Sequence, residues 1–430
     1  MRRYIHLALI AAVAASAPVT PGRATPMEFL DRILDFAEDT LDQKTRDPNA
    51  PAPFRVGLLL PKSGPQREAA QRIARGWEIA LKMSDDHVAD RPVKIVLIKT
   101  GKGPERALRI ADRVTADNPI DVFAGVLGAN MAGVMARYTD LLRKPLVLAG
   151  AVGEAVMSEV CYDHVARTSF NIAPYQTTSG RFFAGKIKTL VTVGPDSKGG
   201  YRLIRRFSKA YRAAGGRIIE QAWATTGRKY DWSALLSRAA QSGPEALYAF
   251  FEGRNAERIV HQHSRIGLKY QVALIGPEWL YGPRALNRRG KHAAGARFLT
   301  SFLPDLETSA NKIFVDSYRD AYGEDPDAYA YMGYENALAV LLTAAEVGGQ
   351  TQDGAAFVAT MKKVSFFGFM PRGEFGLNTT NSAFLKRLYW VEAVKGQDRT
   401  HLKRLKTIPI DPDLSVCKKQ TAQTGTGIRG

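Results

Sequence analysis

The chain has 430 residues, of which 45% are hydrophobic and 24% charged, and its formal net charge at pH 7 is +18. This length is too great for one compact domain and suits two lobes, each with enough apolar residues for a core. The positive charge suggests attraction to acidic partners, but the sequence argues against nucleic acid, because the basic residues are scattered and no nucleic-acid motif is present.

The N-terminus is typical of an export signal. Arg2 and Arg3 precede the apolar run 7–15, which is too short to span a membrane, and small residues follow it. We therefore expect residues 1–24 to be a signal peptide cleaved after Ala15 or Ala24, although a buried N-terminal strand is the alternative. No later apolar run approaches about twenty residues, so we expect no membrane span and a soluble protein in the periplasm.

Residues 25–53 form an N-terminal extension. Apolar and acidic residues alternate with helical spacing over 27–41, which predicts a short acidic amphipathic helix. This helix would dock on a partner or fold back on the basic body of its own chain. Three prolines, at positions 48, 51 and 53, then predict a stiff linker.

Residues 54–150 alternate strand and helix. The expected strands are 54–60, 93–99, 122–127 and 146–149, and the expected helices between them are 66–83, 105–116 and 131–143. Such alternation predicts a doubly wound parallel sheet, in which ligands bind beyond the carboxyl ends of the strands. Two successive strands here end in small-residue turns, at Gly128 and at Gly150, where a ligand could approach backbone N–H groups.

The pattern restarts after an extended stretch at residues 167–169. The expected strands are 188–193, 217–224, 246–251, 271–275 and 296–302, and the expected helices are 201–214, 232–241 and 256–266. Helices are then predicted over 311–322, 329–347 and 354–363, and strands over 373–375 and 384–394. Residues 396–430 read as a basic, weakly structured tail.

Motifs of catalysis are missing from the sequence. There is no G-x-S-x-G elbow, P-loop or H-E-x-x-H. His261 and His263 are two apart on an expected helix and do not share a face, so they are not expected to bind a metal. The sequence therefore predicts no enzyme, no catalytic residue, no metal site and no cofactor. Cys161 and Cys417 are the two cysteines of the chain, and in an oxidising compartment they are a candidate disulfide.

Seven segments, in order, resemble the type I periplasmic solute-binding proteins of ABC importers, and within them the branched-chain amino-acid branch. They are VGLLLPKSGPQREAAQRIARGWEIAL, DVFAGVLGANMAGV, KPLVLAGAV, VARTSF, YDWSALLSRAAQSGPEALYAFFEG, SRIGLKYQVALIGPEW and SYRDAYGEDPDAYAYMGYENALAVL. The resemblance covers about residues 54–395. It implies an α/β protein of two doubly wound parallel-sheet lobes joined by three crossovers, near 167–171, 302–306 and 361–366. Lobe 1 would comprise 54–168 and 303–362, and lobe 2 would comprise 169–302 and 363–395.

The resemblance also implies the ligand-binding residues. These are Ser63, Arg67, Gly128, Ala129, Asn130, Ala151, Gly153 and Tyr331 in lobe 1, and Lys198, Glu252 and Glu278 in lobe 2; Trp279, next to Glu278, is a further candidate. Glu278 matches the acidic residue that pairs with the ligand's ammonium group in the relatives.

The chain departs from the family at several of these positions. Ala129 and Gly153 replace the hydroxyl residues that help to hold an amino-acid carboxylate, and an aromatic residue expected near Lys198 is missing. Glu252 adds a carboxylate to that of Glu278, and buried carboxylates need compensation. A cationic ligand, a metal ion, or Lys62, Arg67 or Lys198 could supply it. Trp279 and Tyr281 would either stack on an aromatic ligand or pack in the core.

The expected function is capture of a small molecule between the lobes and its delivery to the membrane subunits of an ABC permease. The ligand is less expected to be a plain branched-chain amino acid than in the rest of the family. The alternative is a periplasmic ligand sensor or an accessory protein that partners a neighbouring periplasmic enzyme, which the acidic helix and basic tail would favour.

Overall fold

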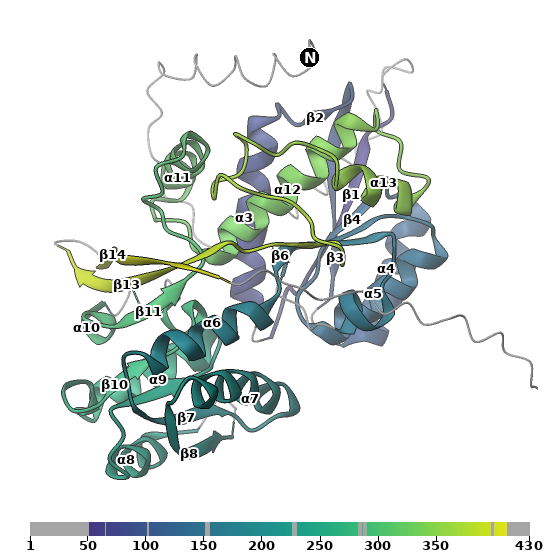
Figure 1. Cartoon of the computed structure of the whole chain (residues 1–430). Helices are drawn as coiled ribbons and strands as arrows, with labels where there is room; N and C mark the ends of the chain where they lie inside the picture. Colours follow the sequence, from purple (N-terminus) through teal and green to yellow (C-terminus); the bar gives the residue numbers. More distant parts are fainter. Residues whose placement is uncertain are drawn as a thin grey trace, which may run out of the picture. The chain divides into compact units, whose positions relative to one another are not determined.

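A computed structural model describes residues 51–410, with gaps at 65, 101–102, 151–154, 226–229, 283–285, 287–289 and 397–399. The expected signal peptide, acidic helix and most of the linker lie outside the described residues, and so does the tail beyond residue 410. The chain divides into two compact units, unit 1 (Met1–Ala149, Tyr162–Ala166 and Gly333–Ser365) and unit 2 (Gly150–Cys161, Arg167–Met332 and Phe366–Gly430). Figure 1 shows the elements of both.

Unit 1 is built on a parallel sheet. Its strands are β1 (Phe54–Leu60), β3 (Arg91–Lys99), β4 (Val122–Gly125) and β5 (Leu146–Leu148), and β6 (Val165–Phe170) begins in this unit. They stand in the order β6-β5-β4-β1-β3, and the short β2 (His87–Val88) pairs antiparallel with β3. The doubly wound α/β arrangement predicted from the alternating pattern is confirmed, and β1, β4 and β5 consist almost wholly of buried residues.

The helices of unit 1 are α3 (Arg67–Met83), α4 (Pro104–Asp117), α5 (Ala129–Leu141), most of α12 (Ala328–Glu346) and α13 (Gly354–Met361). Helix α12 is secured by Asn336, whose side chain accepts a hydrogen bond from Trp77 on α3 and donates one to the Val147 carbonyl of β5. A buried amide that is hydrogen-bonded to both neighbours fixes the orientation of the helix against the sheet.

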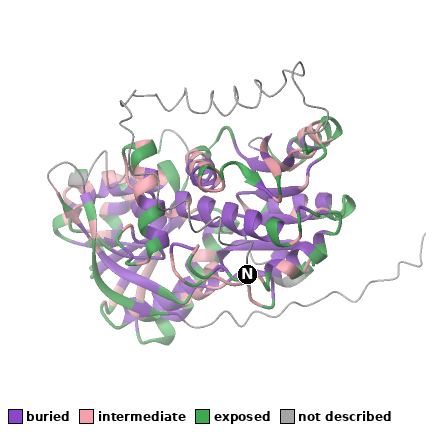
Figure 2. Ribbon diagram, turned by 90° about the horizontal axis from the view of Figure 1, so that it is seen from above, coloured by how far each residue is buried: buried purple, intermediate pink, exposed green. Residues whose placement is uncertain are grey.

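Unit 2 contains a second parallel sheet, in the order β10-β9-β7-β8. Its strands are β7 (Thr189–Pro195), β8 (Arg217–Ala224), β9 (Ala246–Ala249) and β10 (Ala273–Ile275), and its helices include α6 (Ile172–Ala184), α7 (Lys198–Ala213), α8 (Ser233–Gln241) and α9 (Gly253–Arg265). Figure 2 shows the strands mostly in the purple of buried residues, with green on outward-facing stretches of the helices.

An antiparallel sheet, β11-β13-β14, completes unit 2. It comprises β11 (Arg297–Thr300), β13 (Arg387–Lys395) and β14 (Thr400–Pro409). The remaining elements of the unit are η3 (Ala155–Val160), η4 (Leu268–Tyr270), η5 (Glu278–Tyr281), α10 (Gly290–Ala293), α11 (Ser309–Tyr322) and β12 (Ser382–Ala383). Strand β12 pairs with β6.

Two predictions about these elements were wrong. The strand expected at 373–375 is irregular chain, and the strand near it is β12. Part of the expected tail is β14, which pairs with β13 along its whole length. Helix α6 was not predicted at all. In addition, residues 303–332, expected in lobe 1, belong to unit 2, and the chain passes between units within α12.

Among the residues described, no helix is long and apolar enough to cross a membrane.

Candidate functional site

In unit 1, the turn after β4 begins helix α5 directly. Gly128, at φ +89°, is its N-cap residue, and a Cβ atom placed there would lie 3.7 Å from the Gln66 amide oxygen. The Gln66 side chain, which the sequence did not single out, therefore lies beside this turn. Ala129 and Asn130 form the exposed first turn of α5, where backbone N–H groups have no partner within the helix.

Two further predicted residues of unit 1, Ser63 and Arg67, are also exposed. Ser63 lies in the bend after β1, and Arg67 is the first residue of α3. Ala151 and Gly153 were expected to follow β5, and both lie outside the described residues. The described part of the candidate site in unit 1 is thus the turn after β4 with Ser63 and Arg67, and the geometry of the turn suits a carboxylate held by backbone N–H groups.

In unit 2, Glu278 begins η5 with a side chain that is only 5% exposed. Its carboxylate accepts hydrogen bonds from the Thr300 hydroxyl at 2.8 Å, the Ser301 N–H at 2.7 Å and the Ser301 hydroxyl at 2.9 Å. Burial raises the pKa of Glu278, whereas these hydrogen bonds and the charge of Arg372 lower it.

Arg372 supplies the compensating charge. Burial lowers the pKa of Arg372 to about 10, while the nearby Glu278 raises it. The intramolecular cation of Glu278 is thus Arg372, rather than Lys62, Arg67 or Lys198. Because its oxygens already accept three kinds of donor, Glu278 is better suited to hold the chain after β11 in place than to bind an ammonium group.

Tyr331 lies near the same arginine. Its ring stacks on Phe302 with centroids 4.7 Å apart, and the Arg372 guanidinium carbon stands 4.9 Å from the ring centroid. Tyr331 is 1% exposed, and its hydroxyl has no hydrogen-bond partner among the described residues. Arg372 was missed because it lies nearly a hundred residues from Glu278 and no local pattern distinguishes it.

Trp279 and Tyr281 pack in the core of unit 2. The Trp279 ring lies 5.5 Å from Tyr175 and 6.0 Å from Phe250, and its side chain is 5% exposed. Tyr281 stacks on Phe298 at 4.8 Å and donates a hydrogen bond to the Leu274 carbonyl. These contacts favour the packing alternative over stacking on a ligand.

Lys198 and Glu252 occupy helix starts in unit 2. Lys198 is the first residue of α7, after the Ser197 cap, and Glu252 is the N-cap residue of α9. Both are exposed at the surface, but the surrounding protein partly desolvates the Glu252 carboxylate and so raises its pKa.

A cavity of about 90 Å³ in unit 2 is bordered by Glu278, Thr300, Phe302, Asp327 and His401, among others. It is smaller than the roughly 150 Å³ cavity that holds a benzene molecule, so it does not accommodate an aromatic solute. Its acidic residues also have partners, since Asp327 accepts a hydrogen bond from the Ala330 N–H of α12.

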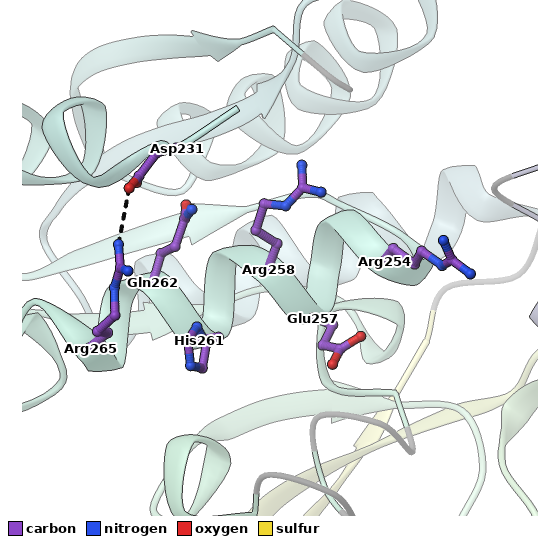
Figure 3. Close-up of a pocket in the computed structure, with 7 residues that line it drawn as sticks. All are labelled: Asp231, Arg254, Glu257, Arg258, His261, Gln262 and Arg265. Carbon is purple, nitrogen blue, oxygen red and sulfur yellow. Dashed lines mark hydrogen bonds and ion pairs between the residues drawn. The ribbon is translucent and has the colours of Figure 1, made fainter. Parts of the chain in front are cut away.

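A more open pocket of about 290 Å³ lies along the outer face of α9. Figure 3 shows its seven lining side chains, with Arg265 paired to Asp231 at 3.0 Å. His261 borders it and lies edge-on to His292, whereas His263 is buried and its Nε2 is 2.9 Å from the Val272 carbonyl oxygen. Within the described part of the chain, no group of three His, Cys, Asp or Glu residues could hold a metal ion.

The comparisons agree with this architecture. Residues 53–398 match the family of periplasmic binding proteins. A solute-binding protein of an ABC transporter from R. palustris, solved in complex with benzoate, is 24% identical with a TM-score of 0.77, over 85% of this chain and 100% of that one. A second, from Rhodopseudomonas palustris BisB5 in complex with 3,4-dihydroxybenzoic acid, is 23% identical with a TM-score of 0.75, over 83% and 97%.

A leucine-binding protein, LivK from Thermotoga maritima, is 20% identical with a TM-score of 0.71, over 83% of this chain and 99% of that chain. No curated protein sequence matches significantly. Since the family match spans most of the chain and both units have the parallel α/β architecture, this chain belongs to the periplasmic binding protein family.

Proposed function

We propose that this protein binds a small organic solute and delivers it to the membrane subunits of an ABC importer. The observation that carries the proposal is the family match over residues 53–398, which includes both α/β units. Family membership implies a location outside the cytoplasm. Binding alone, without catalysis, would then be the activity, and residues 1–24 would be removed on export.

The proposed ligand is an aromatic carboxylate. Two similar structures were solved with benzoate and 3,4-dihydroxybenzoic acid. The turn at Gly128, Ala129 and Asn130 presents helix N-terminal N–H groups to an anion and has no hydroxyl at Ala129. Two features disfavour an amino acid. The turn lacks the side-chain hydroxyl that would help to hold an amino-acid carboxylate, and Glu278, which could pair with an ammonium group, is already engaged by Ser301 and Arg372.

The proposed ligand contacts are those predicted from the family. In unit 1 they are Ser63, Arg67, Gly128, Ala129 and Asn130. In unit 2 they are Ala151, Gly153, Lys198 and Glu252, together with the buried Glu278, Trp279 and Tyr331. A disulfide between Cys161 and Cys417 remains part of the proposal, since Cys417 lies outside the described residues.

Isothermal titration of the mature protein with benzoate, 4-hydroxybenzoate, 3,4-dihydroxybenzoate and leucine tests the proposal. We expect saturable binding of an aromatic acid and weaker or no binding of leucine. Ala129→Asp places a negative charge at the turn without disfavouring the helix start, so it should weaken binding of the acid at least tenfold.

Ala116→Asp, at an exposed position of α4, is the control and should bind as the unaltered protein does. Tighter binding of leucine than of any aromatic acid would reject the ligand class, and an absence of binding to any small molecule in a wider screen would reject solute capture itself.

A further inference from the structure

The positive charge of the chain is concentrated in one part of unit 2. Between residues 165 and 219 the sequence has eleven Lys and Arg residues and a single acidic residue, Asp196. Over the sequence as a whole the basic residues are scattered, but in this segment they outnumber the acidic ones strongly. The segment forms β6, α6, β7, α7 and the start of β8. Helices α6 and α7 pack together, as Figure 1 shows.

Helix α7 carries the most regular part of this charge. Its exposed face holds a basic stripe, which we define as Lys198, Arg202, Arg205, Lys209 and Arg212. The spacing of three or four residues places these side chains in one row about 21 Å long, at 1.5 Å per residue. The opposite face is buried through Ile204, Phe207 and Tyr211.

Acidic partners for this row are missing from the described residues. Helix α7 and helix α6 contain no Asp or Glu, and none of the residues of the basic stripe forms an ion pair with a described residue. Asp196, before the helix, instead accepts a hydrogen bond from the Tyr201 hydroxyl. Like charges at this spacing repel one another, so a surface that supplies anions would relieve an unfavourable interaction.

The pocket along α9 is different. Its arginines alternate with Glu257 and Asp231, and Arg265 is paired with Asp231. The Arg258 guanidinium lies over the Trp232 ring at 5.5 Å, which leaves it committed to a contact within the unit. The α9 face thus has two acidic residues beside its three arginines, whereas the basic stripe of α7 has none.

We propose that the basic stripe of α7 holds the protein on an anionic phospholipid bilayer. A specific protein interface has an apolar core, but the outward face of α7 has one exposed large hydrophobic side chain, Tyr201 at 41%. A layer of phosphate groups needs no matching shape, only a row of long cationic side chains. Family membership places the chain in a compartment bounded by such membranes, so attachment would keep the loaded protein near its permease.

The test is sedimentation of the mature protein with vesicles of phosphatidylcholine alone or with 30% phosphatidylglycerol, at low and at high salt. We expect binding only to the anionic vesicles and its loss at high salt, because exposed charges are screened. The triple variant Arg202→Glu, Arg205→Glu and Lys209→Glu should bind on the order of a hundredfold more weakly, at about fivefold per basic side chain.

The matched control is Arg106→Glu, Arg109→Glu and Arg113→Glu on α4, where the same number of exposed arginines lies among Glu105, Asp112 and Asp117. It changes the net charge equally and should lower binding by no more than a few fold. Equal loss in both triple variants, or equal binding to neutral vesicles, would overturn the proposal.

A protein that begins at residue 51 separates the stripe from the N-terminal extension. It should still bind the anionic vesicles, and loss of binding on this truncation would assign attachment to residues 25–50 instead. Unchanged melting temperatures verify that the variants fold. None of these measurements requires a solute, so they are independent of the proposed transport function.

Discussion

Burial makes His263 a determinant of acid stability. The residue is 4% exposed, and its pKa is lowered to about 4, mainly by burial; the hydrogen bond to the Val272 carbonyl opposes this shift and the charge of Lys269 adds to it. The unfolded chain binds this proton more readily, so stability is complete above pH 6.5 and falls as the pH drops toward 4. The loss should reach about 3 kcal/mol.

Urea unfolding of His263→Gln at pH 7 and pH 4.5 measures this contribution. The variant should lose less stability between the two pH values than the unaltered protein, since glutamine cannot be protonated. His401→Gln, at an exposed position, should not alter the pH dependence. If His263→Gln retained the full acid loss, another group would have to be responsible.

Glu335 has the opposite effect on pH dependence. It lies on α12 with 1% exposure, and burial raises its pKa well above the ordinary value. The folded protein therefore holds this proton more tightly than the unfolded chain. Its contribution to stability is complete below pH 4.5 and is lost as the pH rises through the raised pKa.

The melting temperature of Glu335→Gln relative to the unaltered protein should therefore increase from pH 4.5 to pH 8. In a chain of this size, each kcal/mol of added unfolding free energy raises the melting temperature by about a few degrees or less. Glu346→Gln, on the exposed end of the same helix, serves as the control and should show no such trend. A difference that stayed constant with pH would show that the pKa of Glu335 is the same in the folded and unfolded protein.

At the scale of elements, the contact between α3 and α12 depends on Gly333. A Cβ atom at this position would lie 2.1 Å from the Ile73 carbonyl oxygen, which is backbone and cannot move aside cheaply. Gly333→Ala should therefore lower the free energy of unfolding by about 1–3 kcal/mol through overpacking.

Chemical denaturation would measure this loss. Gly199→Ala on α7 is the matched control, because the nearest atom to its Cβ is the Ser197 hydroxyl oxygen at 4.0 Å. Alanine has the higher helix propensity, so the control should be neutral or slightly stabilising. Equal effects of the two substitutions would mean that α3 and α12 do not approach as closely as described.

The elements that sequence alone could predict are those with a strong local pattern. The parallel strands of both units have continuous apolar runs, and their helices have a clear polar face, so their positions were predicted within a few residues. Helix α6 was missed because Pro174, Gly180 and its β-branched residues weaken helix propensity. The helix nevertheless starts after Asn171, whose side chain caps it by accepting a hydrogen bond from the Ala173 N–H. Strand β14 was missed because nearly all its side chains are exposed, so no alternation marks it.

The candidate site was predictable only in part, for the same reason. The turn at Gly128 follows from a strand that ends in small residues, which is a local pattern. The environment of Glu278 depends on Thr300, Ser301 and Arg372, which are brought to it by the fold of unit 2. A carboxylate that seemed available to a ligand is thereby engaged within the protein, and sequence spacing does not reveal such a partner.

At the scale of the whole molecule, the proposed Cys161–Cys417 disulfide would close a loop of more than 250 residues. Restricting the unfolded chain in this way stabilises a protein by up to about 5 kcal/mol. Cys161→Ser, Cys417→Ser and the double variant should therefore melt at the same lowered temperature, because either change alone removes the bond. The unaltered, exported protein should show no reactive thiol in denaturant until it is reduced. Two thiols per chain before reduction, or an additive loss in the double variant, would show that the cysteines are not joined.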